Sequence, residues 1–130
     1  MKKVSWEDIS QSGNSLLSPA WKLNGHVFTS GCLGTDASGN LPESVEQQTE
    51  NAIKNLEAVL KFSGLDLNRV LKVLLFISNG DDAAVVNKVY AKYFLNKPAR
   101  SCVILQFPNP NVKVELECVA EYIDYEAPKL

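Results

Sequence analysis

In the second half of the chain the sequence reads Val70-Leu71-Lys72-Val73-Leu74-Leu75-Phe76-Ile77-Ser78, a nearly continuous apolar run. Turn-forming residues bound it on both sides, Asn68-Arg69 before it and Asn79-Gly80 after it. A short apolar run between turn signals is typical of a strand that is covered on both faces. We therefore expect a doubly buried central strand here, and the rest of the fold is predicted outward from it.

An amphipathic helix is predicted upstream of this strand, from Ser44 to Phe62. Glu43 or Ser44 can cap its first turn, Gln47 can complete a capping box, and Gly64 can end it in the left-handed conformation. Its apolar residues recur at helical spacing, whereas most of its charges lie elsewhere around the axis. The predicted buried face consists of Val45, Ala52, Ile53, Leu56, Val59 and Leu60.

A second helix is predicted downstream, capped by Asp81 or Asp82 and ended by Asn96-Lys97-Pro98. Its stripe toward the sheet is Val86, Val89, Tyr90 and Tyr93.

Strands are predicted at both ends of the chain. The segment from His26 to Gly31 follows the turn pair Asn24-Gly25 and should pair with residues 18–22 as a hairpin. The segment from Val112 to Ile123 alternates regularly, so one face packs on the helices. The other face carries carboxylates and is either solvated or presented to another subunit.

This element order predicts an α+β fold with two helices on one face of a mixed sheet. A length of 130 residues, 45% of them apolar, fits a single domain over residues 1–130. The second face of such a sheet stays partly open. Several copies closing around a symmetry axis would cover it.

Charge and composition exclude several classes of partner. The net charge of −2 offers no basic field for nucleic acid. The first residues, Met1 to Asp8, contain no apolar core for secretion, and no apolar run is long enough to span a membrane. We therefore expect a soluble cytoplasmic protein.

The cysteine and histidine pattern argues against metal and disulfides. The odd cysteines Cys32, Cys102 and Cys118 show no C-x-x-C spacing, and His26 is the single histidine. We expect each cysteine to be a small buried residue and His26 an ordinary strand residue.

Two residues could carry chemistry. Arg100 follows the rigid Pro98 at the entry of a strand, where its planar fork could hold a carboxylate; alternatively it pairs with a neighbouring glutamate at the sheet edge. Glu115 lies on the polar face of the last predicted strand. It is either simply solvated or, under a second subunit, able to orient or deprotonate a water.

Several blocks of this sequence resemble the YjgF/Rid family, also called endoribonuclease L-PSP. They are Pro98-Ala99-Arg100-Ser101-Cys102-Val103, Phe107-Pro108 and Val114-Glu115-Leu116-Glu117, together with Phe28-Thr29-Ser30-Gly31, Val70 to Phe76 and Val86-Asn87-Lys88-Val89-Tyr90. The resemblance implies a chorismate-mutase-like fold, a homotrimer with clefts between adjacent subunits, and hydrolysis of 2-iminopropanoate or 2-iminobutanoate to a 2-keto acid and ammonia. It implies no metal and no organic cofactor.

The resemblance also implies roles for single residues. Arg100 would clamp the substrate carboxylate and Glu115 would hold the attacking water. The residues lining the pocket would be Cys102, Ser30, Gly31 and Asn87.

The chain departs from the family pattern at two positions. Leu17 stands where a tyrosine is usual, and Cys32 where a glutamine is usual. Both changes bear on which substrate is accepted.

Two other functions stay open. One is a non-catalytic trimer that binds a small carboxylate ligand in the same clefts and reports its level. The other is a ribonuclease or translation inhibitor, against which the acidic balance and the lack of a histidine pair count.

Overall fold

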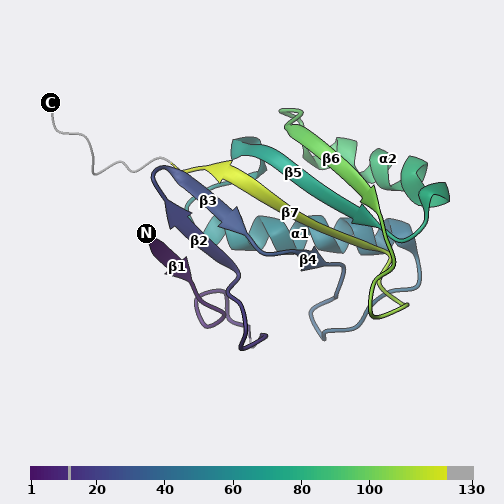
Figure 1. Ribbon diagram of the computed structural model, residues 1–130, viewed down its shortest axis with the longest axis horizontal. Helices are drawn as coiled ribbons and strands as arrows, with labels where there is room; N and C mark the ends of the chain where they lie inside the picture. The colour runs from purple at the N-terminus through teal and green to yellow at the C-terminus, as the bar shows by residue number, and fades with distance from the viewer. Residues whose placement is uncertain (12, 123–130) are drawn as a thin grey trace, which may run out of the picture.

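The computed structural model describes residues 1–11 and 13–122, which form one sheet covered on one side by helices (Figure 1). The strand order is β1-β2-β3-β7-β5-β6, and β4 also pairs with β7. Only β5 and β6 run parallel; the other pairs are antiparallel, so the mixed sheet is confirmed. The strands are β1 Lys2–Val4, β2 Ala20–Leu23, β3 His26–Thr29, β4 Cys32–Leu33, β5 Val70–Ile77, β6 Ala99–Ile104 and β7 Val114–Glu121.

Two helices lie side by side on one face of this sheet: α1 Val45–Phe62 and α2 Ala83–Tyr93 (Figure 1). Short 3-10 turns, η1 Leu67–Arg69 and η2 Gly80–Asp82, flank β5. The α+β architecture is therefore confirmed. The main core fills the space between helices and sheet, and its fully buried large residues include Ile53, Leu56, Leu60, Leu75, Ile77, Val86 and Leu116.

Helix α1 starts and ends close to where the sequence predicts. Ser44 is its N-cap, and the Ser44 Oγ accepts a hydrogen bond from the Gln47 amide at 3.2 Å. The capping box is only half formed, because the Gln47 side chain donates to Asn51 instead. Gly64 has φ +82° and supplies the left-handed residue after the helix.

Helix α2 buries part of the predicted stripe, Val86 and Val89. Asp82, one of the two predicted residues, is the N-cap of this helix, but its side chain makes no capping hydrogen bond. Its backbone is in the right-handed helical region, with φ −84° and ψ −7°, whereas a capping side chain usually belongs to an extended residue. One turn earlier Asn79 accepts from the Asp81 amide at the start of η2.

The predicted hairpin is formed by β2 and β3. Asn24 and Gly25 both have positive φ, 49° and 80°, as a two-residue hairpin turn requires. Strand β2 begins at Ala20 rather than at the predicted Ser18, because the carbonyls of Ser18 and Pro19 accept hydrogen bonds from Ser30.

Strand β5 is central in the sheet, yet the prediction that both its faces are buried is wrong for the single chain. Val73, Leu75 and Ile77 point to the helices and are buried. On the other face Phe76 is half-buried, and Leu71, at the register irregularity between Val70 and Lys72, is 45% exposed. The physical reason is that both helices cover the same side of the sheet.

Strand β7 shows the predicted alternation. Val114, Leu116, Cys118 and Ala120 are buried toward the helices, and the residues between them are half-buried up to Val119. The strand starts at Val114 instead of Val112, which is buried in the preceding turn. The predicted final residue, Ile123, lies outside the described residues.

We call the uncovered side of the sheet the open face. The strand registers place apolar side chains in rows across it, since directly paired residues point to the same side. One row joins Phe28, Val119 and Lys72, and the next joins Glu117, Leu74 and Ser101. A third row joins Glu115, Phe76 and Val103. The open face therefore combines apolar side chains with two glutamates and a lysine. Within the described residues, no helix is both long and apolar enough to cross a membrane.

Candidate functional site

Arg100 is an exposed residue on the edge strand β6, on the helix side of the sheet. Its Nη1 donates to the Asn87 Oδ1 at 2.9 Å, and its Cζ lies 4.7 Å from the centre of the Tyr90 ring. Among residues 1–11 and 13–122 no salt bridge involves Arg100, whereas Arg69 pairs with Glu121 at 3.1 Å. The alternative in which Arg100 pairs with an edge glutamate is therefore wrong for the described chain.

The three cysteines occupy three different environments, and none forms a disulfide. Cys118 is buried as predicted, Cys32 is half-buried, and the prediction of burial is wrong for Cys102, which is exposed on β6. All six residues of the edge strand β6 are exposed. Cys102 follows Arg100 by two residues, so both side chains point to the same face of the sheet. Burial raises the pKa of both the Cys32 and Cys118 thiols to about 12.

Ser30 and Gly31 form the short link between β3 and β4. The Ser30 Oγ donates to the Ser18 carbonyl at 2.5 Å, which ties the link to the segment before β2. A Cβ on Gly31 would come within 2.7 Å of the Glu115 Cδ. Glycine at position 31 therefore allows the Glu115 carboxyl to lie directly against the backbone.

Glu115 lies half-buried on the open face, beside Gly31. Burial raises its pKa above the ordinary carboxyl value, and the charge of Glu117 raises it further. A carboxylate with a raised pKa takes up a proton more readily than a fully solvated one, which suits a general base.

The sheet separates Arg100 from Glu115. Arg100 pairs in register with Val73, whose side chain is buried under the helices, so Arg100 lies on the helix side. Glu115 pairs with Phe76 on the open face. The structure thus forms two groups that do not meet within one chain. The arginine group is Arg100, Asn87, Tyr90 and Cys102, and the glutamate group is Ser30, Gly31 and Glu115.

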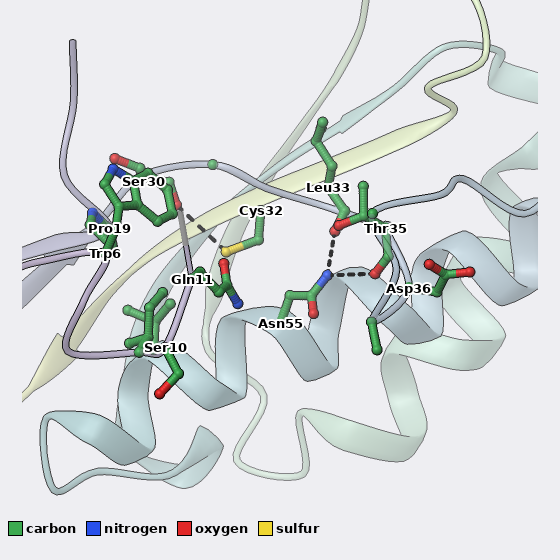
Figure 2. A pocket seen from close by; sticks show the side chains of 15 residues that line it. Trp6, Ser10, Gln11, Pro19, Ser30, Cys32, Leu33, Thr35, Asp36 and Asn55 are labelled. Carbon is green, nitrogen blue, oxygen red and sulfur yellow. Dashed lines mark hydrogen bonds between the residues drawn. The ribbon is translucent and has the colours of Figure 1, made fainter. Parts of the chain in front are cut away.

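A pocket of about 570 Å³ is lined by Ser30 and Gly31 of the glutamate group, but not by Glu115 (Figure 2). Its walls come from the N-terminal segment, the β3–β4 link, the following loop and α1. Asn55 of α1 closes one side, where its Nδ2 donates to the carbonyls of Leu33 at 2.8 Å and Thr35 at 3.0 Å. The residues around it are largely neutral, and include Trp6, Ile9, Gln11, Ser30, Gly31, Cys32 and Val59.

Leu17 does not line this pocket. Its side chain is 45% exposed, and its carbonyl accepts from the Trp6 Nε1 at 3.0 Å. The same indole N–H lies 3.1 Å from the Asn14 carbonyl, so Trp6 holds the loop that carries Leu17. The sequence analysis missed Trp6, because an irregular segment has no periodicity that would mark it. Only the structure shows that Trp6 packs against Gly13 so closely that a Cβ there would not fit.

No group of three or more His, Cys, Asp or Glu side chains suited to a metal ion occurs in the part of the chain that the structure describes. His26 lies on β3, where its Nδ1 is 3.1 Å from the Asn24 carbonyl.

Both groups consist of residues that match a known protein family. The family profile described as Endoribonuclease L-PSP matches residues 13–122. The chain therefore belongs to the endoribonuclease L-PSP family, which is the YjgF/Rid family of reactive intermediate deaminases.

Individual relatives carry more specific names. The chain is 42% identical over 106 residues to Reactive Intermediate Deaminase A, chloroplastic, of Arabidopsis thaliana, which covers 79% of this chain and 57% of the plant protein. It is 39% identical over 105 residues to Protein HMF1 of Saccharomyces cerevisiae. This match covers 79% of this chain and 81% of the yeast protein. The matched part thus spans little more than half of the plant relative.

Among solved structures, the chain is similar to Escherichia coli TdcF with bound serine. The TM-score is 0.85 at 28% identity, with 94% of this chain and 100% of the other covered. The names of these relatives support deaminase-like activity in general. They do not specify the substrate of this chain.

Proposed function

We propose that this protein hydrolyses reactive 2-imino acids, such as 2-iminopropanoate and 2-iminobutanoate, to 2-keto acids and ammonia. The observation that carries the proposal is the state of Arg100, which is held by a neutral amide and an aromatic ring and has no ion pair among the described residues. A guanidinium has five N–H donors, and only one of them is used by Asn87. The others can bind a substrate carboxylate through two parallel hydrogen bonds.

We further propose that the working form is a homotrimer with its sites between subunits. Arg100 and Glu115 lie on opposite sides of one sheet, so a cleft that contains both takes one residue from each of two adjacent chains. The apolar residues of the open face support this assembly, because covering Phe28, Phe76 and Val103 removes apolar area from water at about 25 cal/mol per Å². Closed cyclic symmetry repeats the same contact around the axis.

In the proposed reaction Arg100 holds the carboxylate and Glu115 activates a water. The water oxygen adds to the imine carbon while the Glu115 carboxylate accepts a proton. Glu115 then returns that proton to the nitrogen, and ammonia leaves with the bonding pair as the C–N bond breaks. The hydroxyl gives its proton to the Glu115 carboxylate, and the carbonyl forms. A protonated imine is already electrophilic, so the protein mainly positions the reactants and stabilises charge. The serine bound to E. coli TdcF supports this proposal, since it carries the same carboxylate next to a nitrogen-bearing carbon.

The test is competition with semicarbazide for 2-iminobutanoate generated in the assay by a threonine dehydratase. Wild-type protein should accelerate formation of the keto acid, and Arg100→Ala should lose about 2 to 5 kcal/mol of transition-state stabilisation, about 30-fold or more in rate. The matched control is Arg69→Ala, which removes the other arginine of the chain and its exposed ion pair. Equal rates for wild type and Arg100→Ala would reject the assigned role of Arg100.

The non-catalytic carboxylate-binding trimer is a second candidate, favoured by Leu17. An exposed leucine in the position where the family usually has tyrosine offers no hydroxyl to substrate or water. Glu115→Gln separates the two functions. If the protein is an enzyme, this variant should bind 2-ketobutyrate normally and lose most of its turnover. If wild type binds 2-ketobutyrate without accelerating hydrolysis, the binding protein is favoured.

A further inference from the structure

Tyr90 is a polar residue of α2 whose hydroxyl is buried and has no hydrogen-bond partner among the described residues. An unsatisfied buried hydroxyl is costly, and packing alone could be provided by phenylalanine. The contacts that link Tyr90 to Arg100 and Phe94 are made by the ring.

Two groups lie against the Tyr90 ring. Phe94 stacks on it with ring centres 4.3 Å apart and an interplanar angle of 26°. The Arg100 Cζ lies 4.7 Å from the ring centre. The same ring therefore contacts both an aromatic side chain and the guanidinium. Phe94 is only 2% exposed, which anchors the stack in the core.

Asn87 adds a directional contact from the same helix. It lies three residues before Tyr90, which places both side chains on one side of α2. Its amide oxygen accepts from the Arg100 Nη1 at 2.9 Å. The guanidinium is thus held by two contacts, the ring at its Cζ and the amide oxygen at its Nη1. The remaining N–H groups keep one direction.

We propose that Tyr90 is the positioning residue of Arg100: its ring, supported by Phe94, holds the guanidinium in the orientation that receives a carboxylate. This inference rests on the proposed use of Arg100 as the carboxylate clamp. Pre-orientation matters because arginine carries large rotamer entropy, which is otherwise lost when the ligand binds. Loss of this pre-orientation should therefore weaken ligand affinity and raise KM more than it lowers kcat.

The first test needs neither ligand nor turnover. The sequence contains two arginines, Arg69 and Arg100, so side-chain N–H resonances in a ¹⁵N-labelled sample can be assigned with Arg69→Lys. The ring current over the Tyr90 face should shift the Arg100 resonances upfield of those of Arg69. Tyr90→Phe should retain the shift, because it keeps the ring, and Tyr90→Leu should lose it.

The second test is affinity for 2-ketobutyrate by calorimetry. Tyr90→Phe should stay within about twofold of wild type, whereas Tyr90→Leu should bind about fivefold more weakly, the order of magnitude of a partly desolvated cation–π contact. In the Arg100→Lys background, Tyr90→Leu should not weaken 2-ketobutyrate binding further, since lysine has no planar guanidinium for the ring to hold. A purely structural role would give the same loss in both backgrounds.

The matched control is Tyr93→Leu. Tyr93 belongs to the same helix stripe, but its hydroxyl donates to Glu50 of α1 at 2.8 Å and its removal should leave the Arg100 resonances in place. If Tyr90→Leu does not fold, the wild-type spectrum still decides: unshifted Arg100 resonances overturn the proposal. Equal losses of 2-ketobutyrate affinity in Tyr90→Phe and Tyr90→Leu would overturn the proposal as well. A protein without deaminase activity but with shifted Arg100 resonances would reject the proposed function and retain this inference.

Discussion

At the residue scale, accessibility separates the three thiols of the chain. Cys102 is exposed on β6, while the pKa of Cys32 and of Cys118 is raised to about 12 by burial. Because only the thiolate reacts, the raised pKa keeps half-buried Cys32 and buried Cys118 protonated and slow to react near neutral pH. Cys102 also lies beside Arg100, so its reactivity reports on the proposed carboxylate site.

Alkylation of the native protein with iodoacetamide at pH 8 should therefore modify Cys102 alone. In denaturant all three cysteines should react. Peptide mass spectrometry identifies the modified positions, and Cys102→Ser is the control that should leave the native protein unlabelled. Saturating 2-ketobutyrate should slow the reaction if Cys102 lines the cleft. Rapid labelling of Cys32 in the native state would contradict the burial.

The same pKa shifts make stability depend on alkaline pH. The folded state holds the Cys32 and Cys118 protons more tightly than the unfolded chain, whose thiols titrate near the usual value of 9.0. Their stabilising contribution is complete below pH 9 and is lost as the pH rises from about 9 toward 12. Thermal unfolding of wild type and Cys118→Ala over this range should show the weaker pH dependence in the variant. Parallel pH curves would mean that Cys118 is not desolvated.

At the element scale, one buried polar side chain joins α1 to the turn before β7. Gln48 is fully buried, and its Nε2 donates to the carbonyls of Pro42 and Asn111, both at 2.8 Å. Its Oε1 accepts from the Lys113 amide at 2.9 Å. A single side chain therefore satisfies three backbone groups and sets where β7, and with it Glu115, begins.

Gln48→Leu should destabilise the fold by roughly 3 kcal/mol, since each buried backbone group left without a partner costs about 1 to 3 kcal/mol. The neighbouring variant Gln47→Ala should change stability by about 0.5 kcal/mol or less, because Gln47 is exposed. Urea unfolding at one fixed protein concentration measures both. Equal stabilities of the two variants would mean that water can replace Gln48.

At the scale of the whole molecule, the open face is the feature that a single chain leaves unexplained. Phe28 is 45% exposed in β3, and Leu71 is equally exposed in the central strand β5. A sheet with helices on one side needs a second packed layer to bury its other side, and further copies of the chain can supply one. We therefore expect the proposed trimer to depend on open-face residues and not on exposed apolar residues elsewhere.

Phe28→Asp should weaken the trimer, and Phe62→Asp should not. Phe62 ends α1 on the other side of the sheet and is 49% exposed, which makes it a control of equal size and exposure. Size-exclusion chromatography with light scattering should give a trimer for wild type and Phe62→Asp and a smaller species for Phe28→Asp. Loss of activity should accompany dissociation, because the cleft needs two chains. A monomeric, active wild type would exclude the proposed assembly.

Local pattern was enough to predict much of this protein. The helical periodicity before Phe62, the alternation from Val114 and the Asn24-Gly25 turn each depend on residues close in sequence, and the structure contains the predicted element in each case. Strands as short as β1 and β4 were missed, because two or three residues show no period. Arg100 and Glu115 could be selected by residue type and family motif.

Only the tertiary structure decided where those residues lie relative to one another. Whether paired strands share a face depends on register across the sheet, and that register is fixed by contacts between distant segments, such as those of β7 with β5. It places Arg100 on the helix side beside Tyr90 and Asn87, and Glu115 on the open face beside Gly31. The sequence determines the elements and the reactive groups because these depend on neighbouring residues, whereas their separation by the sheet depends on the packing of the whole chain.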